Sequence, residues 1–166
     1  MLVKIKVKKF NIKYSRNLLT IFNSGRKSGK FFRKSLVKFE DHKQWLEKNL
    51  KEKKTNIYLG FKNNFLKPFG YVRFDKLSEN QKIYEVSIAI LKENYGKGLG
   101  TKMLGLALKK FKIAKKLVAI VKKKNIRSYK VFSKNFFKIQ LIKKKNIMSK
   151  NPFDYKTEFY LTKEIK

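Results

Sequence analysis

The sequence contains no cysteine, and its only histidine is His42. A disulfide framework, a zinc site built on thiolates and a cysteine nucleophile are therefore excluded. A metal centre built from several histidines is excluded as well. We expect no metal ion.

Long apolar runs are also missing. No stretch approaches the roughly 20 apolar residues that a membrane-spanning helix needs. Residues 2–10 alternate apolar side chains with Lys. This alternation is typical of a half-exposed strand and differs from a secretory signal peptide. We therefore expect a cytoplasmic protein that does not contact a membrane.

Acidic residues are scarce, with 11 Asp and Glu against 44 Lys and Arg, which gives a formal net charge of +33. Such a chain attracts phosphates, nucleic acid and anionic lipid surfaces. Only five of the basic residues are Arg, the residue that most often recognises phosphates and bases in a bidentate way. Two explanations of the lysine excess stay open. One is a role in binding anions, and the other is the A/T-rich codons that Lys shares with Asn, Ile and Phe.

The composition predicts a single domain over residues 1–166. Hydrophobic residues make up 42% of the chain, which is enough for a sizeable core, and no repeat or Pro-rich linker divides it. The order of patterns predicts an α/β layered fold. In chain order we expect a strand at 2–10, a short helix and a basic loop within 15–35, a helix at 39–51, strands at 56–61, 69–74 and 83–91, a helix at 101–116, a strand at 117–121, a helix at 125–135, and strands at 136–142 and 157–162.

The most informative stretch is Tyr95-Gly96-Lys97-Gly98-Leu99-Gly100-Thr101, which follows a predicted strand and precedes an amphipathic helix. Glycines allow a tight turn that brings several N–H groups to one point, and a helix N-terminus adds partial positive charge. A diphosphate is the natural ligand of such a loop. The alternative is an ordinary glycine-rich turn. The dinucleotide-binding fingerprint and the P-loop both need a different spacing.

This stretch resembles the acetyl-CoA pyrophosphate loop of the GNAT N-acetyltransferases, in which a strand is followed by (Gln/Arg)-x-x-Gly-x-Gly and a helix. Gly98 and Gly100 match the two glycines, while Tyr95 replaces the usual Gln or Arg. A second resemblance begins at Asn125 and runs through Ser128 and Phe132 to Phe137. It is similar to the family pattern Asn-x-x-(Ser/Ala)-x-x-x-Tyr-x-x-x-Gly-Phe.

The resemblance implies a single-domain GNAT fold, with helices flanking a mixed and mostly antiparallel sheet. Its central parallel pair, residues 83–91 and 117–121, would splay apart to hold acetyl-CoA, with a bulge near the end of the first strand. The resemblance also implies which residues bind acetyl-CoA. The backbone of Ile88, Ala89 and Ile90 would pair with pantetheine, residues 95–101 (Tyr95, Gly96, Lys97, Gly98, Leu99, Gly100 and Thr101) would bind the pyrophosphate, and Asn125 and Ser128 would lie beside the pantetheine arm. Asn125 is equally well placed to cap a helix.

The reaction implied is direct transfer of the acetyl group to an amine, with the Ile90 or Leu91 backbone N–H stabilising the oxyanion. In many relatives a Tyr seven residues after the Asn protonates the thiolate, but Phe132 stands there and cannot donate. Ser128 is the best substitute, against the alternative of a helix-surface hydroxyl. Glu85 is the candidate base, against the alternative of a salt bridge to Lys or Arg73.

The acceptor is the least determined part of the prediction. A chain of charge +33 repels cationic amines, so we expect an anionic small-molecule amine, with a nucleotide-linked amino sugar as the first choice. Phe22-Asn23 and the stretch from Leu36 to Leu46 resemble the acceptor side of GNAT enzymes that acetylate UDP-linked 4-amino sugars in pseudaminic-acid-type pathways. The resemblance implies that Asn23, His42, Arg73 and the basic loop 26–34 meet the acceptor.

Several alternatives remain open. A protein N-terminus or another small amine could be the acceptor. A basic nucleic-acid-binding module is the rival from another class, although neither an RNA-binding signature nor an Arg patch supports it. An inactive GNAT homologue that serves as a binding partner is a third. The sequence leaves both a monomer and a homodimer open.

Overall fold

The computed structural model describes residues 4–27, 35–62, 66–78, 80–141, 147–150, 153–154 and 156–165. The predicted basic loop at 26–34 lies outside the described residues from residue 28 onward. The strands are β1 (Ile5–Lys9), β2 (Thr55–Lys62), β3 (Gly70–Ser78), β4 (Ile83–Ile90), β5 (Lys116–Lys122), β6 (Lys138–Ile139) and β7 (Glu158–Glu164). The helices are α1 (Ser15–Lys27), α2 (Phe39–Lys51), α3 (Leu99–Lys110) and α4 (Ile126–Ser133), with single 3-10 turns at η1 (Ile12–Tyr14) and η2 (Lys92–Asn94).

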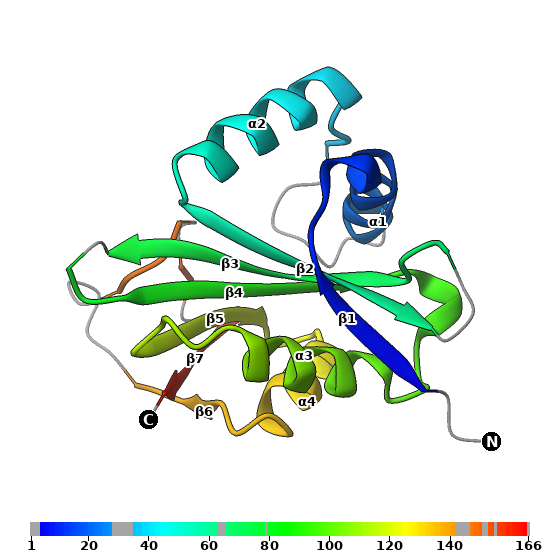
Figure 1. Cartoon of the computed structure of the whole chain (residues 1–166). Coiled ribbons are helices and arrows are strands. Elements are labelled where there is room, and N and C mark those ends of the chain that lie inside the picture. The colour runs from blue at the N-terminus through cyan, green and yellow to red at the C-terminus, as the bar shows by residue number, and fades with distance from the viewer. Residues whose placement is uncertain are drawn as a thin grey trace.

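The strands form one sheet in the order β1-β2-β3-β4-β5-β7-β6, in which β4 and β5 are parallel and the other neighbours are antiparallel. Helices α1 and α2 cover one face, and α3 and α4 cover the other (Figure 1). Each face has its own apolar core because alternate side chains of a strand point to opposite faces. Tyr71 and Ala89 lie in the core under α1 and α2, whereas Val72 and Phe74 lie in the core with α3. The predicted α/β architecture is confirmed.

Helix α2 has the bounds that the sequence predicts, whereas α3 is shifted. Glu40 and Asp41 occupy the first turn of α2, where the helix dipole favours negative charge. The prediction for α3 was residues 101–116, but the helix begins two residues earlier and ends at Lys110. It ends there because Phe111 leaves the helical conformation and stacks on Phe74, with ring centroids 4.0 Å apart.

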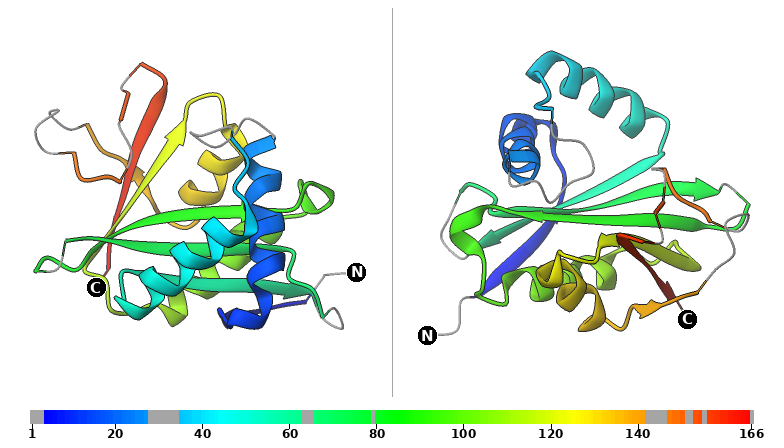
Figure 2. Two further views of the ribbon diagram at one scale, coloured as in Figure 1. Left: turned by 90° about the horizontal axis from the view of Figure 1, so that it is seen from above. Right: turned by 180° about the vertical axis from the view of Figure 1, so that it is seen from behind.

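Strands β4 and β5 are paired only at their beginning. The register joins Ile83 with Lys116, Tyr84 with Leu117 and Glu85 with Val118, and no later pair follows although both strands continue. Strand β5 turns away because its whole length, from Lys116 to Lys122, pairs with β7. Figure 2 (left) shows β4 and β5 diverging from a common start. The predicted splay is therefore present.

The splay has a different origin from the one expected. No bulge interrupts the β3–β4 register between the pair Gly70–Ile90 and the pair Lys76–Tyr84. The irregularity of this ladder lies at Lys76 and Ser78, at the opposite end of the strands. The predicted bulge near the end of β4 is therefore wrong, and the pairing of β5 with β7 opens the gap.

The strand predicted at 136–142 is also wrong in length, since β6 contains two residues. Phe136 has φ of 66°, a left-handed conformation that strands do not use, and its side chain is 78% exposed. The chain therefore turns at this residue before β6 begins.

Candidate active site

The glycine loop turns through two left-handed residues before α3. Gly96 has φ of 76° and Gly98 has φ of 68°, a region that residues with a Cβ rarely adopt. The first helical hydrogen bond runs from the Lys102 N–H to the Gly98 carbonyl at 3.2 Å. The N–H groups of Leu99, Gly100 and Thr101 therefore have no partner within the helix. No acidic residue occupies this first turn, so these donors remain available to an anion.

Gly100 has a different role, because it lets the start of α3 approach its neighbours. A Cβ on Gly100 would lie 2.8 Å from Ile90 Cδ1 and 3.3 Å from Val131 Cγ2. A substitution here would push α3 away from β4 and α4. The glycines of the motif therefore serve two purposes, which are turn conformation at Gly96 and Gly98 and close packing at Gly100.

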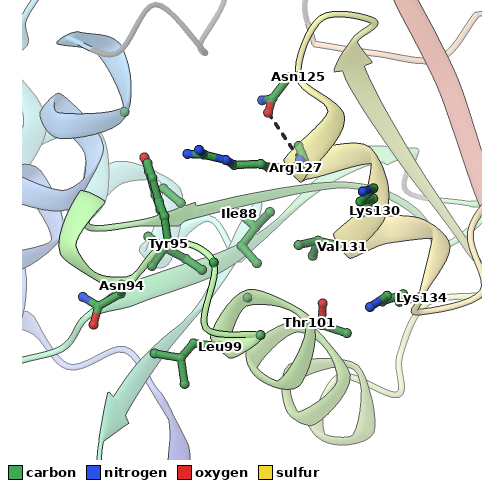
Figure 3. Close-up of a pocket in the computed structure, with 17 residues that line it drawn as sticks. Ile88, Asn94, Tyr95, Leu99, Thr101, Asn125, Arg127, Lys130, Val131 and Lys134 are labelled. Carbon is green, nitrogen blue, oxygen red and sulfur yellow. Dashed lines mark hydrogen bonds between the residues drawn. The ribbon is translucent and has the colours of Figure 1, made fainter.

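A cavity of about 300 Å³ lies over this loop, between the end of β4 and helix α4, which follows β5 in the chain (Figure 3). It is lined by Gly25, Ile88, Ala89, Ile90, Asn94, Tyr95, Gly96, Gly98, Leu99, Gly100, Thr101, Asn125, Arg127, Ser128, Lys130, Val131 and Lys134. The structure thus brings together all the residues predicted to bind the co-substrate except Lys97. The Lys97 ammonium instead donates a 2.8 Å hydrogen bond to the Glu93 carbonyl.

The edge of β4 that faces this cavity carries free backbone groups. The Leu91 N–H donates to the Phe69 carbonyl at 2.9 Å, across the β3–β4 ladder. Backbone groups of an antiparallel strand alternate in direction, so those of Ile88 and Ile90 point away from β3 and toward β5. The splay leaves these groups without a strand partner. Of the two predicted oxyanion donors, Ile90 remains, and Leu91 is excluded because its N–H is already bonded.

Helix α4 and its C-cap residue Lys134 contribute three cations to the cavity that the sequence analysis missed. Arg127, Lys130 and Lys134 recur at helical spacing on the face of α4 that lines the cavity (Figure 3). The Arg127 guanidinium lies over the Tyr95 ring, 5.3 Å from its centroid. None of the described residues that line the cavity is Asp or Glu. The spacing of these cations was visible in the sequence, but it does not stand out among so many lysines.

Asn125 is the N-cap of α4, since its side-chain oxygen accepts a 3.3 Å hydrogen bond from the Ser128 N–H. The helix-cap interpretation of Asn125 is therefore confirmed. Both residues also line the cavity, with Ser128 half-buried. The Phe132 side chain, one turn further on, is only 2% exposed and packs edge-to-face on Phe137 at 5.0 Å. It belongs to the core under α3 and lies outside the cavity lining.

Glu85 lies outside this cavity and holds a distant segment of the chain. Its carboxylate Oε2 accepts two hydrogen bonds of 2.9 Å, from the Ser149 hydroxyl and from the Lys150 N–H. The alternative role for Glu85, a salt bridge to Lys or Arg73, is not seen among the described residues, where Arg73 Nε instead lies 2.8 Å from Asp75 Oδ2. Ser128 lines the cavity and Glu85 does not, so the structure does not bring these two predicted catalytic residues together.

His42 and Arg73 lie in a buried polar cluster between α2 and the sheet. The His42 ring stacks on Trp45 at 6.2 Å and contacts Phe22 at 5.8 Å, and the Arg73 guanidinium lies 5.1 Å from the Trp45 ring centroid. Burial, and secondarily the positive charge of Arg73, lower the pKa of His42 from 6.5 to about 4. His42 is therefore neutral near pH 7 and could meet an anion only as a neutral donor.

Apart from Arg73 Nε, which is ion-paired with Asp75, three buried polar atoms of this region have no hydrogen-bond partner among the described residues. They are His42 Nδ1, the Tyr71 hydroxyl and the Ser87 hydroxyl. Tyr71 pairs with Ala89 and Ser87 pairs with Arg73 across the β3–β4 ladder, so they lie close to one another on one face of the sheet. Unpaired buried polar groups are costly, and they mark places where water or a ligand can bind. No sequence signal distinguished Tyr71 or Ser87 from core residues.

A second cavity of about 700 Å³ lies beside the first and shares Tyr95 and Arg127 with it. It is lined by Thr20, Asn23, Ser24, Lys27, Leu36, Leu91, Lys92, Tyr95 and Arg127. Asn23 was predicted to bind substrate, but both ends of its amide already hold Val37. Its Nδ2 donates to the Val37 carbonyl at 3.0 Å, and its Oδ1 accepts from the Val37 N–H at 3.1 Å. Asn23 thus holds Val37, which lies two residues before α2, beside α1 at the cavity wall.

Two features that other functions would need are missing from the described part of the chain. No group of three His, Asp or Glu side chains lies close enough there to hold a metal ion. Within the same residues, no helix is long and apolar enough to cross a membrane.

Comparison with known proteins places the chain in a family. Residues 17–138 match the model of the acetyltransferase (GNAT) domain, and the chain therefore belongs to the GNAT acetyltransferases. These are enzymes that transfer acyl groups, and acetyl-CoA is the co-substrate. No curated protein matches the chain.

Solved structures of low sequence identity share the fold. The Salmonella typhimurium protein yncA, solved with its cofactor acetyl-CoA, has a TM-score of 0.76 and 14% identity over 98% of this chain and 94% of its own. Spermidine N-acetyltransferase from Vibrio cholerae, in complex with CoA and spermine, has a TM-score of 0.78 and 14% identity over 96% and 95%. Ribosomal-protein-alanine N-acetyltransferase from Brucella melitensis has a TM-score of 0.77 and 17% identity over 96% and 99%.

Proposed function

We propose that acetyl-CoA lies in the cavity between the end of β4, the glycine loop and α4, with its pantetheine arm along the free edge of β4. The proposal is supported by one observation, which is that two sets of free backbone N–H groups lie around the same cavity. One set is on Ile88 and Ile90, and the other is on residues 99–101 at the start of α3. The second set lies at the N-terminus of α3, where the helix dipole adds partial positive charge. Such a site favours binding of the pyrophosphate. Lys130 and Lys134, which line this cavity and not the second one, add positive charge for the 3′-phosphate of CoA.

The same placement supports direct acetyl transfer. A neutral amine attacks the thioester carbonyl, the carbonyl oxygen takes up negative charge, and the C–S bond breaks to release the CoA thiolate. The Ile90 N–H is the proposed donor to the oxyanion. Ser128, which lines the cavity, is the proposed proton donor to the thiolate. Glu85 is the proposed base that takes the amine proton, and because it lies outside the cavity it would act through water.

For the acceptor we propose an anionic amine, with a nucleotide-linked amino sugar as the first candidate. The net charge of +33 and the absence of Asp and Glu from the described lining of both cavities support this choice over a cationic polyamine. A protein N-terminus or another small amine is the alternative, in line with the range of amines named for structures of the same fold.

Calorimetric titration at about physiological salt tests the co-substrate site, with ATP as a control of comparable charge. We expect one acetyl-CoA per chain and at least tenfold weaker binding of ATP, because ATP has no pantetheine arm to pair with β4. Equal and strongly salt-dependent binding of both would contradict the proposal, since scattered lysines would then account for the affinity. Turnover with a panel of amino-sugar nucleotides would follow.

A further inference from the structure

The second cavity has a charge pattern that the co-substrate site does not account for. Three cations converge on it from separate parts of the chain, Lys27 at the end of α1, Lys92 after β4, and Arg127 at the start of α4. In the described part of the chain none of them is paired with a carboxylate. We propose that this cavity binds a phosphate or diphosphate group of the acceptor through Lys27, Lys92 and Arg127. The proposal rests on the proposed acetyltransferase function and specifies its substrate class.

The charge of the cavity favours an anionic occupant. Cations gathered around one space repel one another, and an anion among them relieves this repulsion and gains charge-assisted hydrogen bonds. The described lining contains no acidic side chain that could compete. A polyamine would meet only like charge here, so this cavity selects against cationic amines.

The position of the cavity fits an acceptor. Leu91, which lines it, directly follows Ile90, whose backbone edge faces the first cavity. Tyr95 and Arg127 form part of both walls, so a molecule anchored in the second cavity lies next to the one that holds acetyl-CoA. The phosphates of CoA offer the same chemistry to these cations. The two sources of phosphate are distinguished by whether the second cavity still binds when CoA is in place.

The test uses uridine diphosphate as the probe, titrated by calorimetry into protein saturated with CoA at 150 mM KCl. We expect one site, and about a tenfold loss of affinity (about 1.4 kcal/mol) in Lys92→Ala and in Lys27→Ala, because each variant removes a charge-assisted hydrogen bond to the probe. Lys109→Ala is the matched control, since Lys109 is exposed in the last turn of α3 and lines neither cavity. Its affinity for the probe should equal that of the wild type.

Two results would overturn the proposal. Loss of probe binding on saturation with CoA would show that the cations serve the phosphates of the co-substrate. Equal weakening in Lys109→Ala and Lys92→Ala would show binding by diffuse charge. Failure of the acetyltransferase proposal is seen separately, in the titration with CoA. In that case the same variants, compared in the CoA-free protein, still decide whether Lys27 and Lys92 form an anion site.

Discussion

At the scale of single residues, His42 couples the buried polar cluster to pH. Its pKa falls from 6.5 to about 4 on folding, because burial and the charge of Arg73 disfavour the imidazolium. Between pH 6.5 and 4 the unfolded chain takes up a proton at His42 that the folded protein does not. The free energy of unfolding should therefore fall as the pH drops, by about 2 kcal/mol between pH 7 and 4.5 from this residue alone.

Urea unfolding of the wild type and of His42→Phe across this pH range measures the effect. The variant keeps an aromatic ring between Phe22 and Trp45 but cannot titrate. Both proteins share the same carboxylates, so the difference between their pH profiles isolates the histidine. The stability of the wild type should decline more steeply toward low pH than that of the variant. Parallel profiles would show that His42 titrates alike in the folded and unfolded states.

At the scale of elements, the glycine loop and the start of α3 form one binding device. In Gly98→Val a β-branched residue would have to adopt φ near 68°, which strains the turn and misplaces the N–H groups of residues 99–101. We expect acetyl-CoA affinity to fall by about two orders of magnitude, which corresponds to the loss of one or two charge-assisted hydrogen bonds.

Gly105→Ala provides the matched control for this loop variant. Gly105 lies in the middle of the same helix and outside the cavity lining, and its new Cβ would meet only the Asn135 side chain, at 3.1 Å. This variant should bind acetyl-CoA as the wild type does. A folded Gly98→Val protein with undiminished affinity would refute the assignment of the loop, and thermal unfolding of each variant checks that it is folded.

The elements also show what local sequence can and cannot predict. Helix α2, strand β4 and the glycine loop follow from apolar periodicity, acidic residues in a first turn and glycine spacing, all of which act within a few residues. The splay does not, because it depends on β5 pairing with β7, about 40 residues further along the chain. The partners of Glu85 were unpredictable for the same reason, since Ser149 and Lys150 are distant in sequence. Phe132 was identified as a departure from the family pattern, but only the structure places it in the core.

At the scale of the whole molecule, the charge of +33 acts on every anion, whereas the two cavities act only on ligands that fit them. This difference separates an acetyltransferase with a basic surface from a nucleic-acid-binding module. Scattered lysines bind polyanions by releasing counterions, and that contribution weakens steeply as salt rises. A cavity that also offers backbone donors and apolar contacts to pantetheine retains most of its affinity, because those contacts do not depend on ionic strength.

We therefore expect the two kinds of binding to separate between 50 and 200 mM KCl. Affinity for a 20-nucleotide single strand, measured by fluorescence anisotropy, should fall by roughly three hundredfold to ten-thousandfold if some six to ten phosphates are contacted. Affinity for acetyl-CoA, measured by calorimetry in the same buffers, should fall far less because the ligand carries few charges. Retention of tight, saturable oligonucleotide binding at 200 mM KCl would instead require contacts to bases. That result would favour nucleic-acid binding over acetyl transfer as the function of the basic surface.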